Sequence, residues 1–171
     1  RRADEPLLLR EDISRRLLDL KRELFGDDAG IEIVESLSLM AQAALAQNLA
    51  AQSARLFERA GDEALSISGR NAMQAYSAFA RAADLFGRAS FVDDAARLGG
   101  RAVETLRLMP IAPAPGGVDA HYLAAAERLH ALWLCFSGQL EAAETSARSS
   151  VECFESLLGR SGHVVAFAHA Q

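Results

Sequence analysis

Residues 75–103, AYSAFARAADLFGRASFVDDAARLGGRAV, hold two amphipathic helical patterns separated by a short break. In the first pattern apolar residues recur at positions i, i+3, i+4 and i+7, which places them along one face of an α-helix. These residues are Phe79, Ala82, Ala83 and Phe86. Large side chains alternate with alanines, and an alanine leaves room for a neighbouring helix to come close. The stretch therefore predicts a helix that packs tightly against other helices.

The second pattern begins after Ser90, which interrupts the apolar spacing. A serine followed three residues later by an acid, here Asp93, resembles a capping box, so we expect Ser90 to cap the second helix. Two helices joined by so short a connection predict a helical hairpin. The apolar face of the second helix is expected to consist of Val92, Ala95, Leu98, Ala102 and Val103.

Composition places the chain among globular proteins large enough for one domain with a core. Half of its 171 residues are hydrophobic, yet no apolar run approaches the roughly 18 residues of a membrane span. The net charge is −5 without a block of lysine or arginine, which argues against nucleic acid or an anionic membrane as a partner. Cys135 and Cys153 lie in helical apolar patterns, so we expect two buried free thiols and a cytoplasmic location.

The rest of the chain continues the helical pattern, and nowhere do β-branched or aromatic residues alternate with polar ones as in a strand. Segment 110–117, rich in proline and glycine, is the only loop-like stretch. Further helices are expected at 6–25, 29–47, 50–67, 118–136 and 140–159, with the start of another at 162–171. Their expected inward residues are Leu37, Met40, Ala41, Ala44, Ser53, Phe57, Ala60, Leu129, Leu132, Trp133, Phe136, Leu140, Ala143, Ala147, Val151 and Phe154.

Glycines at the helix breaks indicate a repeat. Gly26, Gly69, Gly116 and Gly159 are 43, 47 and 43 residues apart, and the segment 110–117 lengthens the middle interval. Two helices repeated at this period are typical of an α-solenoid, in which stacked hairpins bury a continuous core. The sequence thus predicts an all-α solenoid of stacked antiparallel hairpins, with about seven or eight helices.

This solenoid is expected to form a single domain over residues 1–171, and both of its ends look like parts of further repeats. We therefore expect a segment of a longer array, whose exposed apolar ends could associate with one another. The expected parts are a helix of a preceding repeat (1–25), three repeats (26–68, 69–109 and 118–159), the insert (110–117) and the start of a next helix (160–171).

With this frame fixed, the sequence resembles the tetratricopeptide repeat family, in particular the form of about 42 residues found in kinesin light chains and bacterial regulators. Leu24-Phe25-Gly26-Asp27-Asp28, Ser36-Leu37 and Gly138-Gln139-Leu140-Glu141-Ala142-Ala143 carry the resemblance. The chain departs from the family pattern at Asn48, where glycine is usual, and at Ser53 and Ser150, where alanine is usual. The resemblance implies a scaffold that binds proteins.

The sequence offers no arrangement of residues that predicts catalysis, a metal site or a cofactor. His121 and His130 are nine residues apart, and His163 and His169 six, so neither pair stacks at i, i+4 as a zinc pair on a helix does. Gly99-Gly100 lies inside a helical pattern and is better explained by close helix packing than by a phosphate loop. We expect no enzyme activity.

The resemblance implies that the first helix of each hairpin lines a concave groove. The lysine or arginine and asparagine of the family's carboxylate clamp are missing, because Ser38, Gln42, Ala80 and Asp84 stand there. The groove could instead take an extended segment or an amphipathic helix, or these residues could simply face solvent. The candidate groove residues are Glu35, Ser38, Gln42, Leu45, Ser77, Ala80, Asp84, Arg88, Ala125, Arg128, Leu132 and Cys135.

Two functions fit this sequence. The first is a non-catalytic interaction scaffold that binds a peptide or helical segment of a partner protein. The alternative is a regulatory or sensor domain of a larger bacterial signalling protein or transcriptional regulator, since repeats of this family often follow such domains. A phosphate-binding loop or a helix-turn-helix next to the repeat array in the full-length sequence would favour the alternative.

Overall fold

The computed structural model describes residues 16, 19–21, 23, 24, 29–67, 71–109 and 118–158. Within these residues the regular structure is entirely α-helical, which confirms the predicted fold class. The predicted helices at 6–25 and 162–171 and the insert 110–117 lie largely or wholly outside the described residues. The helices with described bounds are α2 (Ala29–Ala46), α3 (Ala50–Ser66), α4 (Ala72–Arg88), α5 (Val92–Arg107), α6 (Val118–Phe136) and α7 (Leu140–Leu158).

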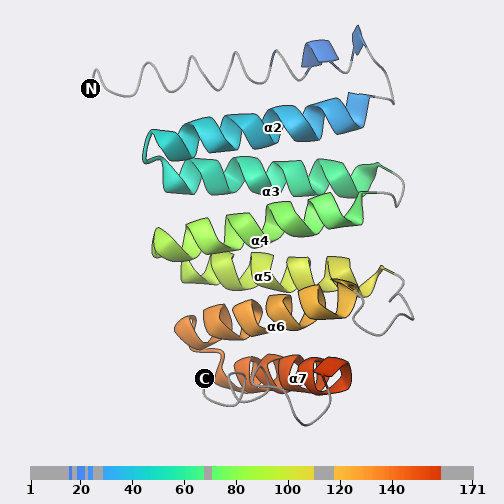
Figure 1. Cartoon of the computed structure of the whole chain (residues 1–171). Helices are drawn as coiled ribbons and strands as arrows, with labels where there is room; N and C mark the ends of the chain where they lie inside the picture. The colour runs from blue at the N-terminus through green and yellow to red at the C-terminus, as the bar shows by residue number, and fades with distance from the viewer. Residues whose placement is uncertain are drawn as a thin grey trace.

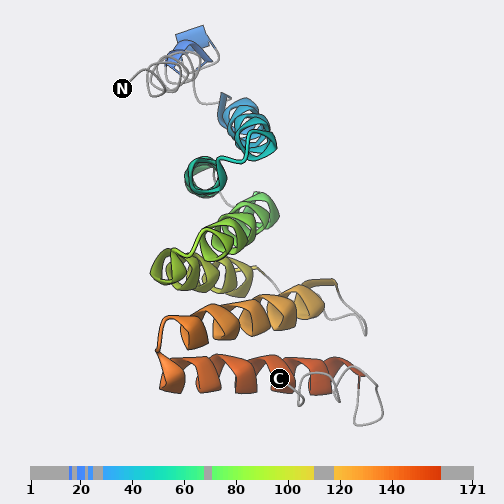
Figure 2. The ribbon, with the colours of Figure 1, turned by 90° about the vertical axis from the view of Figure 1, so that its left-hand side faces the viewer.

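Helices α2 to α7 stack in chain order, and each packs against the next one along the sequence (Figure 1). A quarter turn of the view shows α2 and α3 nearly end on and α6 and α7 from the side, so the stack twists along its length (Figure 2). This arrangement is that of an α-solenoid. No helix among the described residues has the length and apolar character that crossing a membrane requires.

The three hairpins share one turn geometry. Asn48, Ser90 and Gly138 follow the first helix of each hairpin and have positive φ angles of 60°, 67° and 79°. In each turn the next residue donates its N–H to the carbonyl oxygen five residues back, as in a Schellman motif. These bonds join Leu49 to Ala44 at 3.1 Å, Phe91 to Phe86 at 2.9 Å and Gln139 to Leu134 at 2.9 Å. The turns therefore align the hairpins residue by residue.

This geometry corrects the expected role of Ser90. The residue that precedes α5 is Phe91, and no side chain caps the helix there. Ser90 instead occupies the left-handed position that ends α4. A residue with positive φ terminates the preceding helix, so its side chain is not placed to accept hydrogen bonds from the first turn of the next one.

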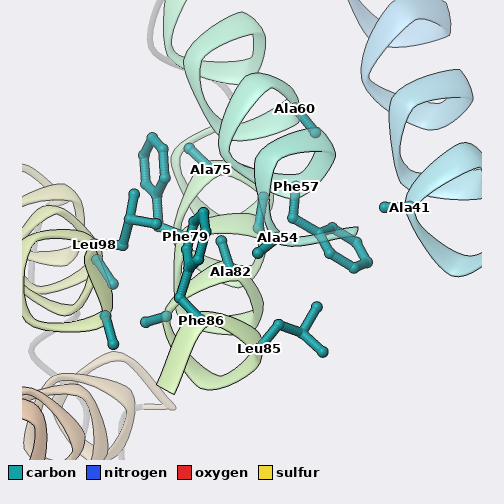
Figure 3. Packing of buried hydrophobic residues seen from close by; sticks show 14 of the residues in the cluster. Ala41, Ala54, Phe57, Ala60, Ala75, Phe79, Ala82, Leu85, Phe86 and Leu98 are labelled. Atoms are coloured by element: carbon teal, nitrogen blue, oxygen red, sulfur yellow. The ribbon is translucent and has the colours of Figure 1, made fainter. Parts of the chain in front are cut away.

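The central stretch forms the core as predicted. Phe79, Ala82, Ala83 and Phe86 are all buried, as are Ala95, Leu98, Ala102 and Val103 on α5. In Figure 3 the rings of Phe79 and Phe86 lie on the side of α4 that faces Leu98, while Phe57 and Leu85 point toward the side of α2. Alternating large and small residues thus let neighbouring helices approach closely.

Two helical glycines lie where aromatic rings cross. A Cβ atom added at Gly61 would lie 2.4 Å from the ring of Phe79, and one added at Gly87 would lie 2.1 Å from the ring of Trp133. At Gly99 a Cβ would lie 3.3 Å from the backbone of His130, which confirms that this glycine serves close packing.

The predicted inward faces of α6 and α7 were partly wrong. Leu132, Phe136, Leu140 and Ala147 are exposed, whereas the spacing of apolar residues placed them inside. The reason is that polar residues occupy much of the true inward faces, where hydrophobic periodicity does not detect them. The buried residues of these two helices are Ala124, Ala126, Glu127, Ala131, Trp133, Leu134, Ala143, Ser146, Ser150 and Phe154.

The two cysteines are free, as expected, but contrary to expectation neither is fully buried. Cys135 is exposed near the end of α6, and Cys153 is half-buried on α7. Burial raises the pKa of the Cys153 thiol, and the nearby Glu127 carboxylate adds to this effect. The Cys153 thiol is therefore not in the electropositive setting that activates a cysteine.

Candidate functional site

A groove of about 400 Å³ lies between α2 and α4, the first helices of two successive hairpins. We call it the α2–α4 groove. Its apolar surface includes Leu39, which is 65% exposed, and the buried ring of Phe57 on α3. The residues that line it are Val34, Glu35, Ser38, Leu39, Gln42, Phe57, Gln74, Ser77, Ala78 and Arg81.

Most polar side chains of this groove form no contact that stabilises the fold of the described residues. Among the described residues, five of them form no hydrogen bond and no ion pair: Glu35, Ser38, Gln42, Gln74 and Ser77. Arg81 differs, because its guanidinium carbon lies 5.6 Å from the centre of the Phe57 ring, within the range of a cation–π contact. The groove thus presents donors and acceptors that the helices do not need for their own packing.

The structure brings together four of the predicted groove residues and separates the rest from them. Glu35, Ser38 and Gln42 on α2 and Ser77 on α4 line the α2–α4 groove. The other candidates do not line it. Asp84 and Arg88 form an ion pair with each other at 2.8 Å. Leu45, Arg128, Leu132 and Cys135 are exposed, and Ala80 and Ala125 are half-buried.

The prediction missed Gln74 and Arg81 for a geometric reason. The predicted positions on α4 were those equivalent to the positions on α2, which assumes that both helices line the groove with the same face. A groove between two neighbouring helices is instead lined by the face of α2 that is directed toward α4 and by the face of α4 that is directed toward α2. Gln74, Ser77 and Arg81 are spaced at i, i+3 and i+7, so helical periodicity through Ser77 could have identified them.

A second polar feature lies between α5, α6 and α7 and was not predicted. The carboxylate of Glu127 on α6 is only 2% exposed. Its Oε1 accepts hydrogen bonds from Arg107 on α5 and from Ser149 at 3.2 Å, and its Oε2 accepts one of 2.5 Å from Ser146. A buried carboxylate needs such donors, because leaving it unpaired would cost several kcal/mol.

His130 completes this cluster. Its Nδ1 lies 3.4 Å from the Ser146 hydroxyl, and its ring packs against Gly99 and Gly100 on α5. Burial lowers the pKa of His130, and the negative charge of Glu127 offsets only part of that effect. The imidazole is therefore neutral near neutral pH.

This serine, histidine and glutamate are not arranged as a catalytic triad. In a triad the carboxylate orients the histidine, and the histidine accepts the proton of the serine. Here the Ser146 hydroxyl donates directly to Glu127, and Ser146 is buried. Its proton is thus held by a carboxylate, away from solvent, so the cluster is built as a structural network and not as a nucleophile.

The fold of this chain is similar to that of a protein of known structure. No protein-family model matches the sequence, and neither does any curated protein. A solved structure that is similar to this chain is BtubC (BKLC) from P. vanneervenii, with a TM-score of 0.60 and 17% sequence identity. The match covers 92% of this chain and 61% of that chain, so this chain spans less than two thirds of that protein's length.

This likeness shows that the chain has the fold of a tetratricopeptide-like helical repeat protein, as the resemblance implied.

Proposed function

We propose that this chain is a non-catalytic scaffold that binds an extended peptide segment of a partner protein in the α2–α4 groove. The observation that carries this proposal is the set of polar side chains in the groove without partners in the described part of the chain. Glu35, Ser38, Gln42, Gln74 and Ser77 offer amide, hydroxyl and carboxylate groups to a ligand.

These groups favour an extended segment over a helix. The backbone N–H and C=O groups of a helix are already paired with each other, so side-chain amides beside a bound helix would find few partners. An extended peptide presents unpaired backbone groups to both walls of a groove. Gln42 on one wall and Gln74 on the other can each donate and accept such bonds.

Apolar and charged surfaces of the groove would add to this recognition. Leu39 is 65% exposed, and covering it would stabilise a complex through loss of apolar surface from water. Glu35 on α2 and Arg81 on α4 place opposite charges on opposite walls. A segment with charges of complementary sign would therefore bind in one direction only.

The experiment is a selection of unstructured peptides from a random library against the whole chain, followed by affinity measurements on the selected peptides. Ser77→Arg should fill the groove, and Arg81→Glu should reverse the charge of one wall, so each should weaken binding about tenfold or more. Arg55→Glu, at an exposed position on α3, is the matched control and should bind like the wild type. Peptides that bind all variants equally would exclude the groove.

A further inference from the structure

The two interfaces between successive second helices differ sharply. Two ion pairs join α3 to α5: Arg97 to Glu58 at 2.7 Å and Arg101 to Asp62 at 2.6 Å. Both arginines come from α5, one turn apart, and both acids come from α3 with the same spacing. Arg101 also lies 4.1 Å from the centre of the Phe79 ring. These two ion pairs thus join α3 to α5, and we call them the clasp.

No ion pair between described residues joins α5 to α7, and a cleft of about 730 Å³ opens there. We call it the α5–α7 cleft. Val103 and Leu134 form part of its apolar surface, and the Glu127 network lies along it. The other residues that line it are Asp93, Ala96, Arg97, Gly100, Glu104, Arg107, His130, Gln139, Ala142, Thr145, Ser146 and Ser149.

Alignment of the hairpins by their turns explains why this interface is open. Counted from Ser90 and Gly138, the α7 residues that correspond to Arg97 and Arg101 are Thr145 and Ser149. Both arginines of the clasp are therefore replaced by short neutral residues. Counted from Asn48 and Ser90, the acid Asp62 of α3 corresponds to Glu104 of α5. Of the two acids on α3, only Asp62 thus has an acidic counterpart on α5, because Glu58 corresponds to Gly100.

The same alignment shows that the interior of this hairpin has become polar. Glu127 corresponds to Leu37 and Phe79, both almost fully buried, and Ser146 corresponds to Leu56 and Leu98. A pair of apolar residues would fill these places at no cost in desolvation. Packing therefore does not require polar residues here, and departures of this kind are expected at functional sites.

The charges of the α5–α7 cleft leave Glu104 without compensation. Arg97 is held by Glu58 and Asp94, and Arg107 is held by Glu127. Asp93 and Glu104, by contrast, form no ion pair with any described residue. Because Glu127 draws Arg107 toward α6, that arginine does not neutralise Glu104, its neighbour one turn earlier on α5.

From these observations we infer that the α5–α7 cleft is a second docking surface, which binds an arginine-bearing segment of a partner protein. The guanidinium of the partner takes the place of the missing clasp arginine and pairs with Glu104. Arginine suits this place, since its planar fork can bind a carboxylate with two hydrogen bonds. The hydroxyls of Thr145 and Ser149 and the amide of Gln139 are on the opposite wall, where they can bind the backbone of the segment.

The test uses fluorescence anisotropy with a labelled peptide in which arginine alternates with alanine. Its counterpart carries citrulline, the neutral analogue of arginine, at the same positions. The arginine peptide should bind the whole chain at least about tenfold more tightly than the citrulline peptide. Glu104→Gln should remove most of this difference, whereas Glu141→Gln, which changes the charge equally at an exposed position outside the cleft, should preserve it.

A second variant supplies the missing arginine within the chain itself. Ser149→Arg should pair with Glu104, occupy the site and weaken peptide binding about tenfold or more. Ser156→Arg adds the same charge at an exposed position on α7 and should bind like the wild type. The inference would be overturned if the two peptides bound equally or if Ser149→Arg bound the arginine peptide as tightly as the wild type. It would also be overturned if free L-arginine displaced the peptide at a concentration equal to that of the peptide's arginines.

Discussion

The hydroxyl of Ser146 on α7 donates a hydrogen bond of 2.5 Å to the Oε2 atom of Glu127 on α6. Both residues stand at positions that are apolar in the two preceding hairpins. The third hairpin therefore has the same backbone plan as the others but a polar interior. Four measurable consequences follow. Two of them concern this polar interior, one concerns a close helix contact, and one concerns the left-handed turns within the hairpins.

The stability of the Glu127 network depends on Arg107. Arg107→Ala should lower the free energy of unfolding by about 1–3 kcal/mol, because it leaves a buried carboxylate with fewer donors. The same change in a Glu127→Leu/Ser146→Leu background should cost much less, since no buried charge remains there. Urea unfolding followed by circular dichroism measures both values, and equal losses in the two backgrounds would contradict the network.

Gly87 allows the ring of Trp133 to cross α4. Gly87→Ala should lower the free energy of unfolding by about 1–3 kcal/mol through overpacking, despite the better helix propensity of alanine. The effect should shrink when Trp133→Leu is also present. Gly100→Ala is the control: its Cβ would lie 3.2 Å from Nε2 of His130, a side-chain tip that can move. If both alanine variants unfold alike, the Trp133 contact is not the cause.

The left-handed turns should respond to glycine in a fixed order. A residue with a Cβ atom loses about 1–2 kcal/mol in this conformation, and asparagine tolerates it better than serine. Ser90→Gly should therefore stabilise the chain by about 1 kcal/mol, Asn48→Gly should do so by less, and Gly138→Ala should destabilise it. The midpoint of thermal unfolding of each variant tests this order. Equal changes in midpoint for the three variants would contradict it.

Burial of His130 makes the stability depend on pH. Its pKa in the folded chain is lowered from the usual 6.5, so unfolding takes up a proton as the pH falls below that value. The free energy of unfolding should then decrease between about pH 6.5 and the folded pKa, and the contribution is fully present above about pH 7. His130→Gln should flatten this part of the curve. A wild-type slope in His130→Gln would disprove this role.

Much of the fold could be predicted from the sequence, because apolar spacing and helix breaks are local signals. The observed α2 and α3 end one residue before the expected ends, and the buried face of α4 is the one predicted from Phe79 and Phe86. The inward faces of α6 and α7 could not be predicted in this way. Periodicity of hydrophobic residues assigns leucine to the core, whereas here Leu132 faces solvent and Glu127 is inside.

The α2–α4 groove could be predicted only in part, since it depends on how two helices face one another. The α2 wall was predicted at Glu35, Ser38 and Gln42, but the α4 wall was not, apart from Ser77. The α5–α7 cleft could not be predicted from apolar spacing. Only the alignment of the turn residues Asn48, Ser90 and Gly138 shows which residues of the three hairpins correspond to one another.

The most direct test of the proposed scaffold function is to map where a selected peptide binds on the intact chain. At 18.4 kDa the chain is suited to backbone amide resonance mapping by NMR. Addition of a peptide selected from the library should shift resonances chiefly at residues 34–42 of α2 and 74–81 of α4, and Ser77→Arg should abolish these shifts. Shifts confined to α6 and α7, or spread evenly over all helices, would contradict binding in the α2–α4 groove.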